Sequence, residues 1–390
     1  MKKLSNITEL FTESVIREMT RISDSIGGIN LSQGFPDFES PAEIKEAACN
    51  AIRMDFNQYP VTFGEPDLRE AIRDKALWYN KIKCSPDTDI TVTCGATEAM
   101  IASLKAIINP GDEVIIFEPF YENYAADAIL SGAIPRYVTL NSPMWNFDMN
   151  ELKSTFNERT KAIIINTPNN PTGKVFSRKE LEDIAELCLK WDAIAITDEI
   201  YEHIVYDQAD HISIASIPEM GNRTITINSI SKTYSVTGWR IGWAIASPEI
   251  TSRIRKVHDF LTVGAPTPFQ IAAVKALSFP RDYYMSLKEK YSGLRSMMHN
   301  ILNINGFKAI SPEGAYYILA GYSELLNTIP VKTDFDFSIK LLEKTGVATV
   351  PGSSFYSSGL NTGYVRFAFC KKPETINLVG RMFSERLKKQ

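Results

Sequence analysis

The chain has 390 residues, of which 44% are hydrophobic and 23% charged, with a formal net charge of -4 at pH 7. Because one ordinary domain has ~100–200 residues, this length predicts one large domain or two unequal ones. No run of basic residues would attract nucleic acid or an anionic membrane. The N-terminal MKKLSNITEL lacks the apolar core of a signal peptide, and no apolar run approaches the roughly 18 residues of a membrane span. We therefore expect a cytoplasmic protein that binds neither membrane nor nucleic acid.

Cysteine and histidine spacing gives no sign of a metal site. The five cysteines lie far apart without a CxxC pair, which is typical of buried thiols in a reducing compartment. The four histidines form neither HExxH nor a Cys/His cluster, so no metal is predicted.

Helical and strand patterns alternate over much of the chain. Residues 66–80 form an amphipathic pattern with Pro66 at its start, which predicts a helix. The remaining expected elements, in chain order, are a strand over 89–94, a helix over 97–108, a strand over 113–117, a helix over 121–130, strands over 134–140 and 161–166, a helix over 177–191, strands over 193–198 and 224–228, and a long helix over 281–305. This order predicts an α/β fold with a mostly parallel sheet covered by helices on both faces. The shorter mixed elements near the C-terminus indicate a smaller second domain, which the N-terminal segment joins.

Polar or turn-forming residues follow five of these strands. The segments are Gly95–Thr97, Glu118–Tyr121, Thr167–Gly173, Asp198–Tyr201 and Ser229–Lys232. Ligands bind outside the carboxyl ends of the strands in open α/β sheets. Each segment taken alone is also compatible with a purely structural turn. Together they make this edge of the sheet the candidate active site.

The chemistry that suits these residues is anion binding combined with amine chemistry. Gly95, Ala96 and Thr97 at a helix start offer N–H groups and a hydroxyl to a phosphate. Ser229 and Arg240 flank Lys232 and could complete a phosphate site beside its amine. A lysine that attacks a carbonyl forms a Schiff base and needs a depressed pKa. Asp198 could stabilise a protonated pyridine nitrogen, as in pyridoxal 5′-phosphate (PLP) enzymes.

Motifs for competing cofactors and mechanisms do not occur. No GxGxxG follows a strand, and no GxxxxGK[ST] is present, since Gly173-Lys174 is followed by Val175. The GxSxG nucleophile elbow of the α/β-hydrolases is also missing.

At this point three segments resemble a known family. SISKTYSVTGWRIGW (229–243), NTPNNPTGKVF (166–176) and DEIYEHIVYD (198–207) are similar to the class I/II aminotransferases of PLP fold type I. The resemblance runs from LSQGFPDF (31–38) to VRFAF (365–369). It implies a large PLP-binding domain with a mostly parallel seven-stranded sheet over residues 46–280. It also implies a smaller α+β domain made of residues 1–45 and 281–390.

The resemblance implies a role for each matching residue. Lys232 would be the Schiff-base lysine and the general base and acid, with Asp198 on the pyridine nitrogen. Tyr201 and Asn170 would hydrogen-bond the phenolic oxygen of the cofactor, and Tyr121 would stack on its ring. The residues expected to hold the phosphate are Gly95, Ala96, Thr97, Ser229, Arg240 and, from the partner subunit of a homodimer, Tyr59. The residues expected to contact substrate are Arg366 and Gly34 on the α-carboxylate, Asn170, and Ile16 in the pocket wall.

The sequence restricts the possible substrates less closely than it restricts the type of reaction. The segments NQYPVTFG (57–64), EPFYENY (118–124) and VPGSSFY (350–356) look most like the kynurenine–oxoglutarate, glutamine–phenylpyruvate and methionine aminotransferase branch. This branch implies large neutral, sulfur-containing or aromatic amino acids and a ping-pong mechanism with a 2-oxo acid. Two departures weaken a kynurenine preference: Ile16 stands where that branch has a pocket tryptophan, and Ala96-Thr97 replaces a Tyr-Gly pair.

Three alternatives stay open at this stage. An aspartate-type aminotransferase is weakened because LTVGAPTPFQ (261–270) has no basic residue, although another cation could bind the distal carboxylate. A PLP-dependent lyase of the cysteine-conjugate β-lyase type would use the same fold. A PLP-sensing regulator would need a DNA-binding domain, and we expect none because the segment before 31–38 contains no basic helix-turn-helix.

Overall fold

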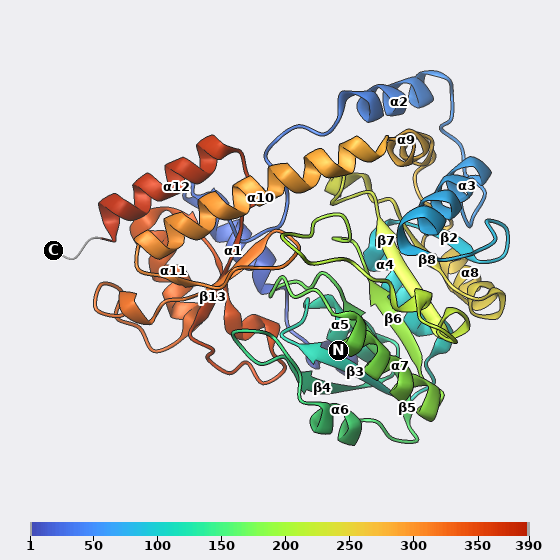
Figure 1. The fold of residues 1–390 in the computed structure, drawn as a ribbon, viewed down its shortest axis with the longest axis horizontal. Coiled ribbons are helices and arrows are strands. Elements are labelled where there is room, and N and C mark those ends of the chain that lie inside the picture. The colour runs from blue at the N-terminus through green and yellow to red at the C-terminus, as the bar shows by residue number, and fades with distance from the viewer. Residues whose placement is uncertain (1, 388–390) are drawn as a thin grey trace.

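Three sheets organise the computed structural model, which describes residues 2–387. The largest has seven strands and occupies the right-hand part of Figure 1, and a four-stranded sheet lies in the C-terminal part on the left. None of the helices in the described residues has both the length and the apolar character needed to cross a bilayer.

The seven-stranded sheet is parallel except for one strand. In sheet order its strands are β2 (Ile90–Thr93), β8 (Gly242–Ile245), β7 (Thr224–Ser229), β6 (Ile194–Asp198), β5 (Thr160–Asn166), β3 (Glu113–Glu118) and β4 (Ile134–Thr139). Strand β8 runs antiparallel to both of its neighbours, β2 and β7. The prediction of a mostly parallel, seven-stranded α/β sheet is therefore confirmed.

Helices cover both faces of this sheet, as the continuous apolar strands require. Alternate residues of β5 point to opposite sides, so that Ile163 and Ile165 pack in one buried cluster and Ala162 and Ile164 in another. Helices α6 (Met149–Thr155) and α7 (Arg178–Trp191) cover the first face. Helices α4 (Gly95–Ile107), α5 (Asn123–Leu130) and α8 (Pro248–Thr262) cover the second.

A further helical group closes the end of the sheet formed by β2 and β8. It consists of α2 (Ala42–Arg53), α3 (Pro66–Lys75) and α9 (Thr267–Leu277), which share one buried cluster with Val92 and Trp243. Figure 1 shows α2 lying beside α9 at the upper right.

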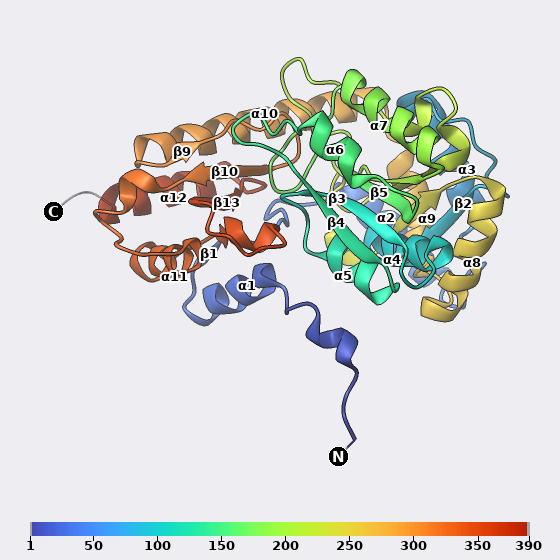
Figure 2. The same ribbon diagram turned by 90° about the horizontal axis from the view of Figure 1, so that it is seen from below.

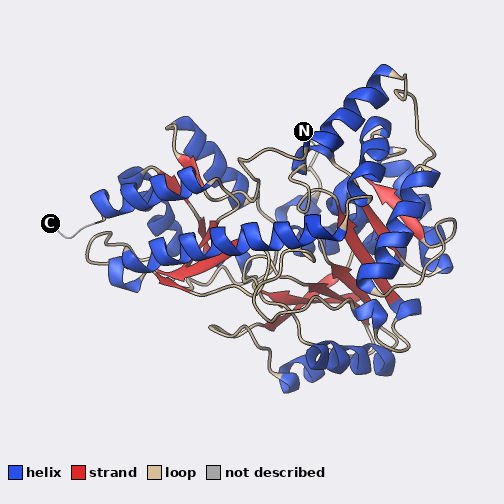
Figure 3. Cartoon of the chain, turned by 45° about the horizontal axis from the view of Figure 1, so that its top comes forward, coloured by secondary structure: helices blue, strands red, loops and turns tan. Residues whose placement is uncertain are grey.

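The C-terminal part is built on an antiparallel sheet packed against helices. Its strands are β12 (Val350–Pro351), β13 (Tyr364–Ala368), β10 (Tyr317–Gly321) and β9 (Lys308–Ala309), in that order. Its helices are α10 (Arg281–Ile304), α11 (Asp334–Thr345) and α12 (Pro373–Arg386). Helix α10 extends from this part toward the large sheet (Figure 3).

The N-terminal segment packs on the C-terminal part of the chain. Strand β1 (Ile29–Asn30) pairs in parallel with β11 (Val347–Ala348). Met19 of α1 (Val15–Ser25) is buried against Leu342 and Ala348. Figure 2 shows α1 below the C-terminal sheet, on the side of α11. These contacts join the N-terminal segment to the C-terminal part, while the composition of the small domain and its boundaries at 45/46 and 280/281 stay predictions.

Several element boundaries differ from the predictions. The helix predicted over 66–80 is α-helical only to Lys75, because residues Ala76–Asn80 form a wider π-helical turn that ends at left-handed Lys81. The helix predicted over 97–108 begins earlier, because Gly95 has φ +80° and lets the chain turn directly from strand into helix. The sequence patterns do not predict α1, α2, α6, β8, α8 or α9. Short 3₁₀ turns lie at Asn6–Glu9, Ile214–Ser216, Gly221–Arg223, Thr237–Trp239, Ser323–Leu325 and Gly352–Phe355.

Candidate active site

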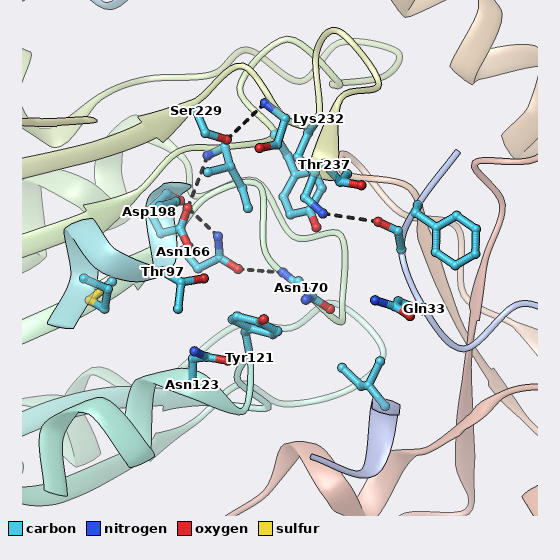
Figure 4. A pocket seen from close by; sticks show the side chains of 18 of the residues that line it. Gln33, Thr97, Tyr121, Asn123, Asn166, Asn170, Asp198, Ser229, Lys232 and Thr237 are labelled. Atoms are coloured by element: carbon cyan, nitrogen blue, oxygen red, sulfur yellow. Dashed lines mark hydrogen bonds between the residues drawn. The ribbon is translucent and has the colours of Figure 1, made fainter. Parts of the chain in front are cut away.

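A cavity of about 470 Å³ lies where β5, β6 and β7 end, between the large sheet, the N-terminal segment and β13. Figure 4 shows its labelled side chains facing a common space, with Asp198 and Asn166 on one wall and Tyr121 and Asn123 on another. Most of the site residues predicted from the sequence line it. These are Ile16, Gly34, Ala96, Thr97, Tyr121, Asn170, Asp198, Tyr201, Ser229, Lys232, Arg240 and Arg366. Gly95 and Tyr59 are not among the lining residues.

Lys232 follows β7 and projects its amine into the cavity. Its Nζ donates a hydrogen bond to the carbonyl oxygen of Gly34 at 3.2 Å. The same nitrogen lies 5.7 Å from the ring centres of Tyr201 and of Tyr316. Burial lowers the pKa of Lys232 from 10.5 to about 8, against the opposing charge of Asp198. With this pKa roughly a tenth of the amine is neutral, and nucleophilic, at pH 7, far more than for an ordinary lysine.

Asp198 ends β6 and is 5% exposed. Its Oδ2 accepts a hydrogen bond from the hydroxyl of Tyr124 at 2.7 Å, and its Oδ1 accepts one from the N–H of Ile200 at 3.3 Å. Burial raises the pKa of Asp198 to about 6, although both hydrogen bonds and the Lys232 charge act in the opposite direction. Asn166 holds the strand end by donating to the carbonyl oxygen of Asp198 at 3.0 Å.

The start of α4 and Arg240 together form an anion site. Gly95 has φ +80°, which favours glycine, and a Cβ on Gly242 would lie 2.5 Å from the backbone nitrogen of Ala96, so both positions need glycine. Arg240 itself has a left-handed backbone, with φ +57°. The first N–H groups of a helix have no partner within the helix, so those of α4 are free to bind an anion. Ser229 also lines this region of the cavity.

Arg366, on β13, is a fully buried cation that lines the same cavity. It is 0% exposed, and its guanidinium carbon lies 4.2 Å from the ring centre of Tyr317. Nη1 donates to Oδ1 of Asn170 at 2.6 Å and Nη2 donates to the carbonyl of Ser32, whereas Nε has no partner among the described residues. No described carboxylate lies within 4.0 Å of the guanidinium. A buried cation without a counter-ion favours an anionic ligand.

Glu122, at the start of α5, fixes the first turn of α1. Its carboxylate accepts hydrogen bonds from the hydroxyl of Ser14 at 2.5 Å and from the N–H of Val15 at 3.1 Å. This arrangement holds Ile16, which is 7% exposed, in the cavity wall beside Tyr121. Burial raises the pKa of Tyr121 to about 12, so its phenol stays neutral.

One group of side chains outside the cavity could be mistaken for metal ligands. Glu199, Glu202 and His211 bring one donor atom each to within 4.8 Å of one another. The ammonium group of Lys75, however, is ion-paired with Glu202 and bonded to Oδ1 of Asn80 at 2.9 Å. The absence of a metal therefore stays a prediction, and this cluster already contains a cation.

Sequence analysis missed several residues of the site. Asn166 ends a predicted strand and could have been found by the strand-end rule, and Tyr124 lies three residues after Tyr121 on the predicted helix. Glu122 and Arg17 gave no signal, because their positions depend on contacts across about a hundred residues of chain. Tyr201 was expected at the cofactor, and its hydroxyl hydrogen-bonds that of Tyr317 at 2.9 Å.

Comparison with known proteins places this geometry in a family. Residues 26–381 match the model of aminotransferase class I and II. The chain is 36% identical to kynurenine–oxoglutarate transaminase 3 of Rattus norvegicus, covering 95% of this chain and 87% of that protein. It is 34% identical to the methionine aminotransferase of Escherichia coli K12, covering 95% of each. The structure of N-succinyldiaminopimelate aminotransferase from Mycobacterium tuberculosis superposes with a TM-score of 0.94 at 35% identity, over 99% of this chain and 100% of that one. The chain therefore belongs to the class I and II aminotransferases and is a PLP-dependent transaminase.

Proposed function

We propose that the enzyme transfers the amino group of a large neutral, sulfur-containing or aromatic L-amino acid to a 2-oxo acid by a ping-pong mechanism. The observation that carries the proposal is the pairing of two groups in one cavity. Arg366 is a buried guanidinium with no carboxylate partner in residues 2–387, and Lys232 is an amine whose pKa burial lowers to about 8. An amino acid bound through its carboxylate to the first would present its α-carbon to the second.

The residues present fit PLP. The free N–H groups of α4, the hydroxyl of Ser229 and the Arg240 guanidinium would hold its phosphate, because Gly95 and Gly242 leave room for close approach. Asp198 would accept a hydrogen bond from the protonated ring nitrogen, while Tyr124 and Ile200 orient the carboxylate. When bound, the cofactor supplies a conjugated ring that withdraws electrons from the substrate α-carbon.

Arg366 and Lys232 would have separate roles at the substrate, binding and proton transfer. Arg366 would bind the α-carboxylate through two N–H groups and so fix which bond at the α-carbon faces the amine. Lys232 would take the proton from the α-carbon as general base and return a proton as general acid. In the structure, the hydrogen bond from Lys232 Nζ to the carbonyl oxygen of Gly34 holds the amine in the cavity.

The character of the cavity wall supports neutral substrates. The side chains of Ile16, Phe35, Tyr121, Ile200 and Tyr317 line it. These aliphatic and aromatic groups would contact a thioether, an aliphatic chain or an aromatic ring, and burial of apolar surface is worth about 25 cal/mol per Å².

We also propose a homodimer in which Tyr59 reaches the partner's site. Tyr59 is 86% exposed and does not line the cavity of its own chain. Phe56 and Val61 in the same loop, and Phe260 in α8, are exposed apolar side chains that such an interface would cover. We propose domain boundaries at 45/46 and 280/281, with the cavity between the two domains.

Replacing Lys232 tests the function directly. Lys232→Ala should lose at least about a thousandfold in transamination rate, because the general base and acid is removed. Lys232→Arg is the matched control, since it keeps the positive charge without a nucleophilic amine, and it should lose as much. Bound cofactor absorbance and amino-acid product would be measured with L-methionine, L-phenylalanine and L-glutamine as donors. Wild-type absorbance and activity in both variants would refute the assignment of Lys232.

The same assay separates a transaminase from a β-lyase. With a cysteine S-conjugate as substrate, a lyase releases pyruvate and ammonia without any 2-oxo acid acceptor. We expect multiple turnovers only when an acceptor is present, with one amino-acid product formed per donor consumed. Equal pyruvate and ammonia without an acceptor would show elimination to be the main reaction.

A further inference from the structure

Two tyrosines of the cavity share a hydrogen bond that the proposed function does not use. Tyr201 follows β6 and Tyr317 begins β10, so they come from the large sheet and from the C-terminal sheet. Their hydroxyl oxygens lie 2.9 Å apart. Both side chains line the cavity, and they are 2% and 3% exposed. Tyr201 is a predicted partner of the phenolic oxygen of PLP, whereas Tyr317 has no role so far.

The position of Tyr317 is fixed by its neighbours. The guanidinium carbon of Arg366, on the adjacent strand β13, lies 4.2 Å from the centre of its ring. The ring of Tyr316 lies on another side, with the two ring centres 5.0 Å apart. A Cβ on Gly34 would overlap the hydroxyl of Tyr317, so that only glycine leaves room for it. The hydroxyl therefore has little freedom to move away from Tyr201.

The direction of this hydrogen bond follows from the number of protons. Burial raises the pKa of both phenols, so both stay protonated and each hydroxyl has one proton to donate. The nearby carbonyl oxygen of Gly34 already accepts from the hydroxyl of Tyr316 at 2.9 Å and from Nζ of Lys232 at 3.2 Å. In residues 2–387, Tyr201 is the partner left for the hydroxyl of Tyr317. When Tyr201 gives its own proton to the cofactor, its oxygen must accept the proton of Tyr317.

We propose that the hydroxyl of Tyr317 positions Tyr201 and strengthens the hydrogen bond that Tyr201 donates to the phenolic oxygen of the cofactor. The inference rests on the proposed function, because it requires PLP to be bound with its phenolic oxygen at Tyr201. A hydroxyl that accepts one hydrogen bond becomes a better donor of the next, and each bond in such a chain gains about 10–30%. The charge of Arg366 opposes the effect of burial on the pKa of Tyr317 and so makes this phenol a stronger donor. Tyr317 is thus a positioning residue that acts on the cofactor through Tyr201.

The expected consequence concerns the charge of the bound cofactor near neutral pH. When the bound cofactor loses its proton, its phenolic oxygen becomes more negative, and a hydrogen bond to that oxygen stabilises the deprotonated form. Together the two hydroxyls therefore lower the pH at which the proton is lost. Tyr317→Phe removes a single oxygen atom and keeps the ring beside Arg366, so it isolates the contribution of the hydroxyl.

The test is a pH titration of the visible absorbance of the holoenzyme in the absence of substrate. Tyr317→Phe should raise the midpoint by about 0.2–0.7 pH unit, because Tyr201 loses the bond that strengthens its own. Tyr201→Phe should raise it further, and adding Tyr317→Phe to Tyr201→Phe should have no additional effect. Tyr322→Phe is the matched control and should leave the midpoint unchanged. Tyr322 directly follows β10, its hydroxyl donates to Oδ1 of Asn361 at 3.3 Å, and it does not line the cavity.

Different results separate failure of the inference from failure of the proposed function. If Tyr317→Phe keeps the wild-type midpoint while Tyr201→Phe raises it, Tyr317 does not act on Tyr201. An equal shift by Tyr317→Phe with and without the Tyr201 hydroxyl would also overturn the inference, because the effect would then reach the cofactor by another route. If Lys232→Ala binds PLP with the same pH-dependent absorbance as wild type, the proposed function itself is wrong, and the inference falls with it.

Discussion

Two adjacent carboxylates at the end of β6 have opposite environments. Asp198 faces the cavity, has one hydroxyl and one N–H as partners, and burial raises its pKa to about 6. Glu199, which is 0% exposed, accepts hydrogen bonds from Asn80 at 3.0 Å and His211 at 2.9 Å. Burial raises its pKa too, but the His211 charge and hydrogen bond outweigh this, so the net pKa of Glu199 is lowered.

The difference shows how the fold separates a structural cluster from a reactive one. The buried ion cluster of Lys75, Asn80, Glu199, Glu202 and His211 pairs its charges within the protein. In the cavity, Lys232, Arg240 and Arg366 lack carboxylate partners among the described residues, so their charges are available to ligands. Arg366 is as buried as the buried ion cluster, whereas Lys232 is partly exposed and Arg240 is exposed. The number of internal partners decides whether a buried ion stabilises the fold or is available for chemistry.

The largest effect is expected on the reaction rate when Asp198, the carboxylate that faces the cavity, is replaced. Asp198→Asn should lower the rate of the first half-reaction by about 10³- to 10⁴-fold, roughly 4 to 5.5 kcal/mol, because a neutral amide cannot stabilise a protonated ring nitrogen. Stability should change little, since the replaced carboxylate has few partners to lose. Single-turnover absorbance and thermal unfolding would measure the two quantities. A variant of near wild-type rate would show that Asp198 is not the partner of the cofactor nitrogen.

For the buried ion cluster we expect the opposite result, a large effect on stability. Lys75→Met should lower the free energy of unfolding by about 3–5 kcal/mol, because it leaves Glu202 buried without its ion-pair partner. Urea unfolding of the cofactor-free protein would measure it. Lys75→Met combined with Glu202→Gln should recover part of the loss. Lys179→Met, which breaks only an exposed pair, should cost far less than Lys75→Met. Equal effects of Lys75→Met and Lys179→Met would refute the importance of the buried cluster.

The features that could be predicted from the sequence are those with a local signal. Most strands of the central sheet appear in the sequence as short apolar runs, and Lys232 and Asp198 stand out because they follow or end such runs. The role of Asn170 is implied by the resemblance of residues 166–176 to the family. Strand β8 is only four residues long and begins at the end of the motif at 229–243, and such a short apolar run does not distinguish strand from helix. Helix α9 combines two prolines near its start with an almost uniformly apolar pattern, so it has little helical periodicity to detect.

The features that could not be predicted depend on contacts between distant segments. Glu122 is found at the start of α1 only when residues more than a hundred positions apart are brought together. Asn80 contacts Glu199 and Glu202 across 119 and 122 positions. Without the fold, the sequence alone gives no reason to expect these residues to be in contact. The same holds for Tyr317, whose hydroxyl contacts that of Tyr201 across 116 positions.

A third buried carboxylate, Asp127 of α5, offers a pH test of the same comparison. It is 6% exposed and lines the cavity, and its Oδ2 has no hydrogen-bond partner among the described residues. Burial raises its pKa from 3.8 to about 7. The folded protein therefore binds a proton that the unfolded chain has already released, and its stability should fall as pH rises from about 4 to 7.

Asp127→Asn removes this cost of ionising a buried group. It should raise the free energy of unfolding by about 2–4 kcal/mol at pH 8, since one pKa unit corresponds to about 1.4 kcal/mol, and the gain should disappear by about pH 4. Urea unfolding of both proteins across this range would measure the difference. The matched control is Asp183→Asn on α7, whose carboxylate is ion-paired with Lys179 and should show no gain at pH 8. A gain for Asp127→Asn that is the same at pH 4.5 and pH 8 would mean that Asp127 has the same pKa in the folded and the unfolded protein, so that burial does not raise it.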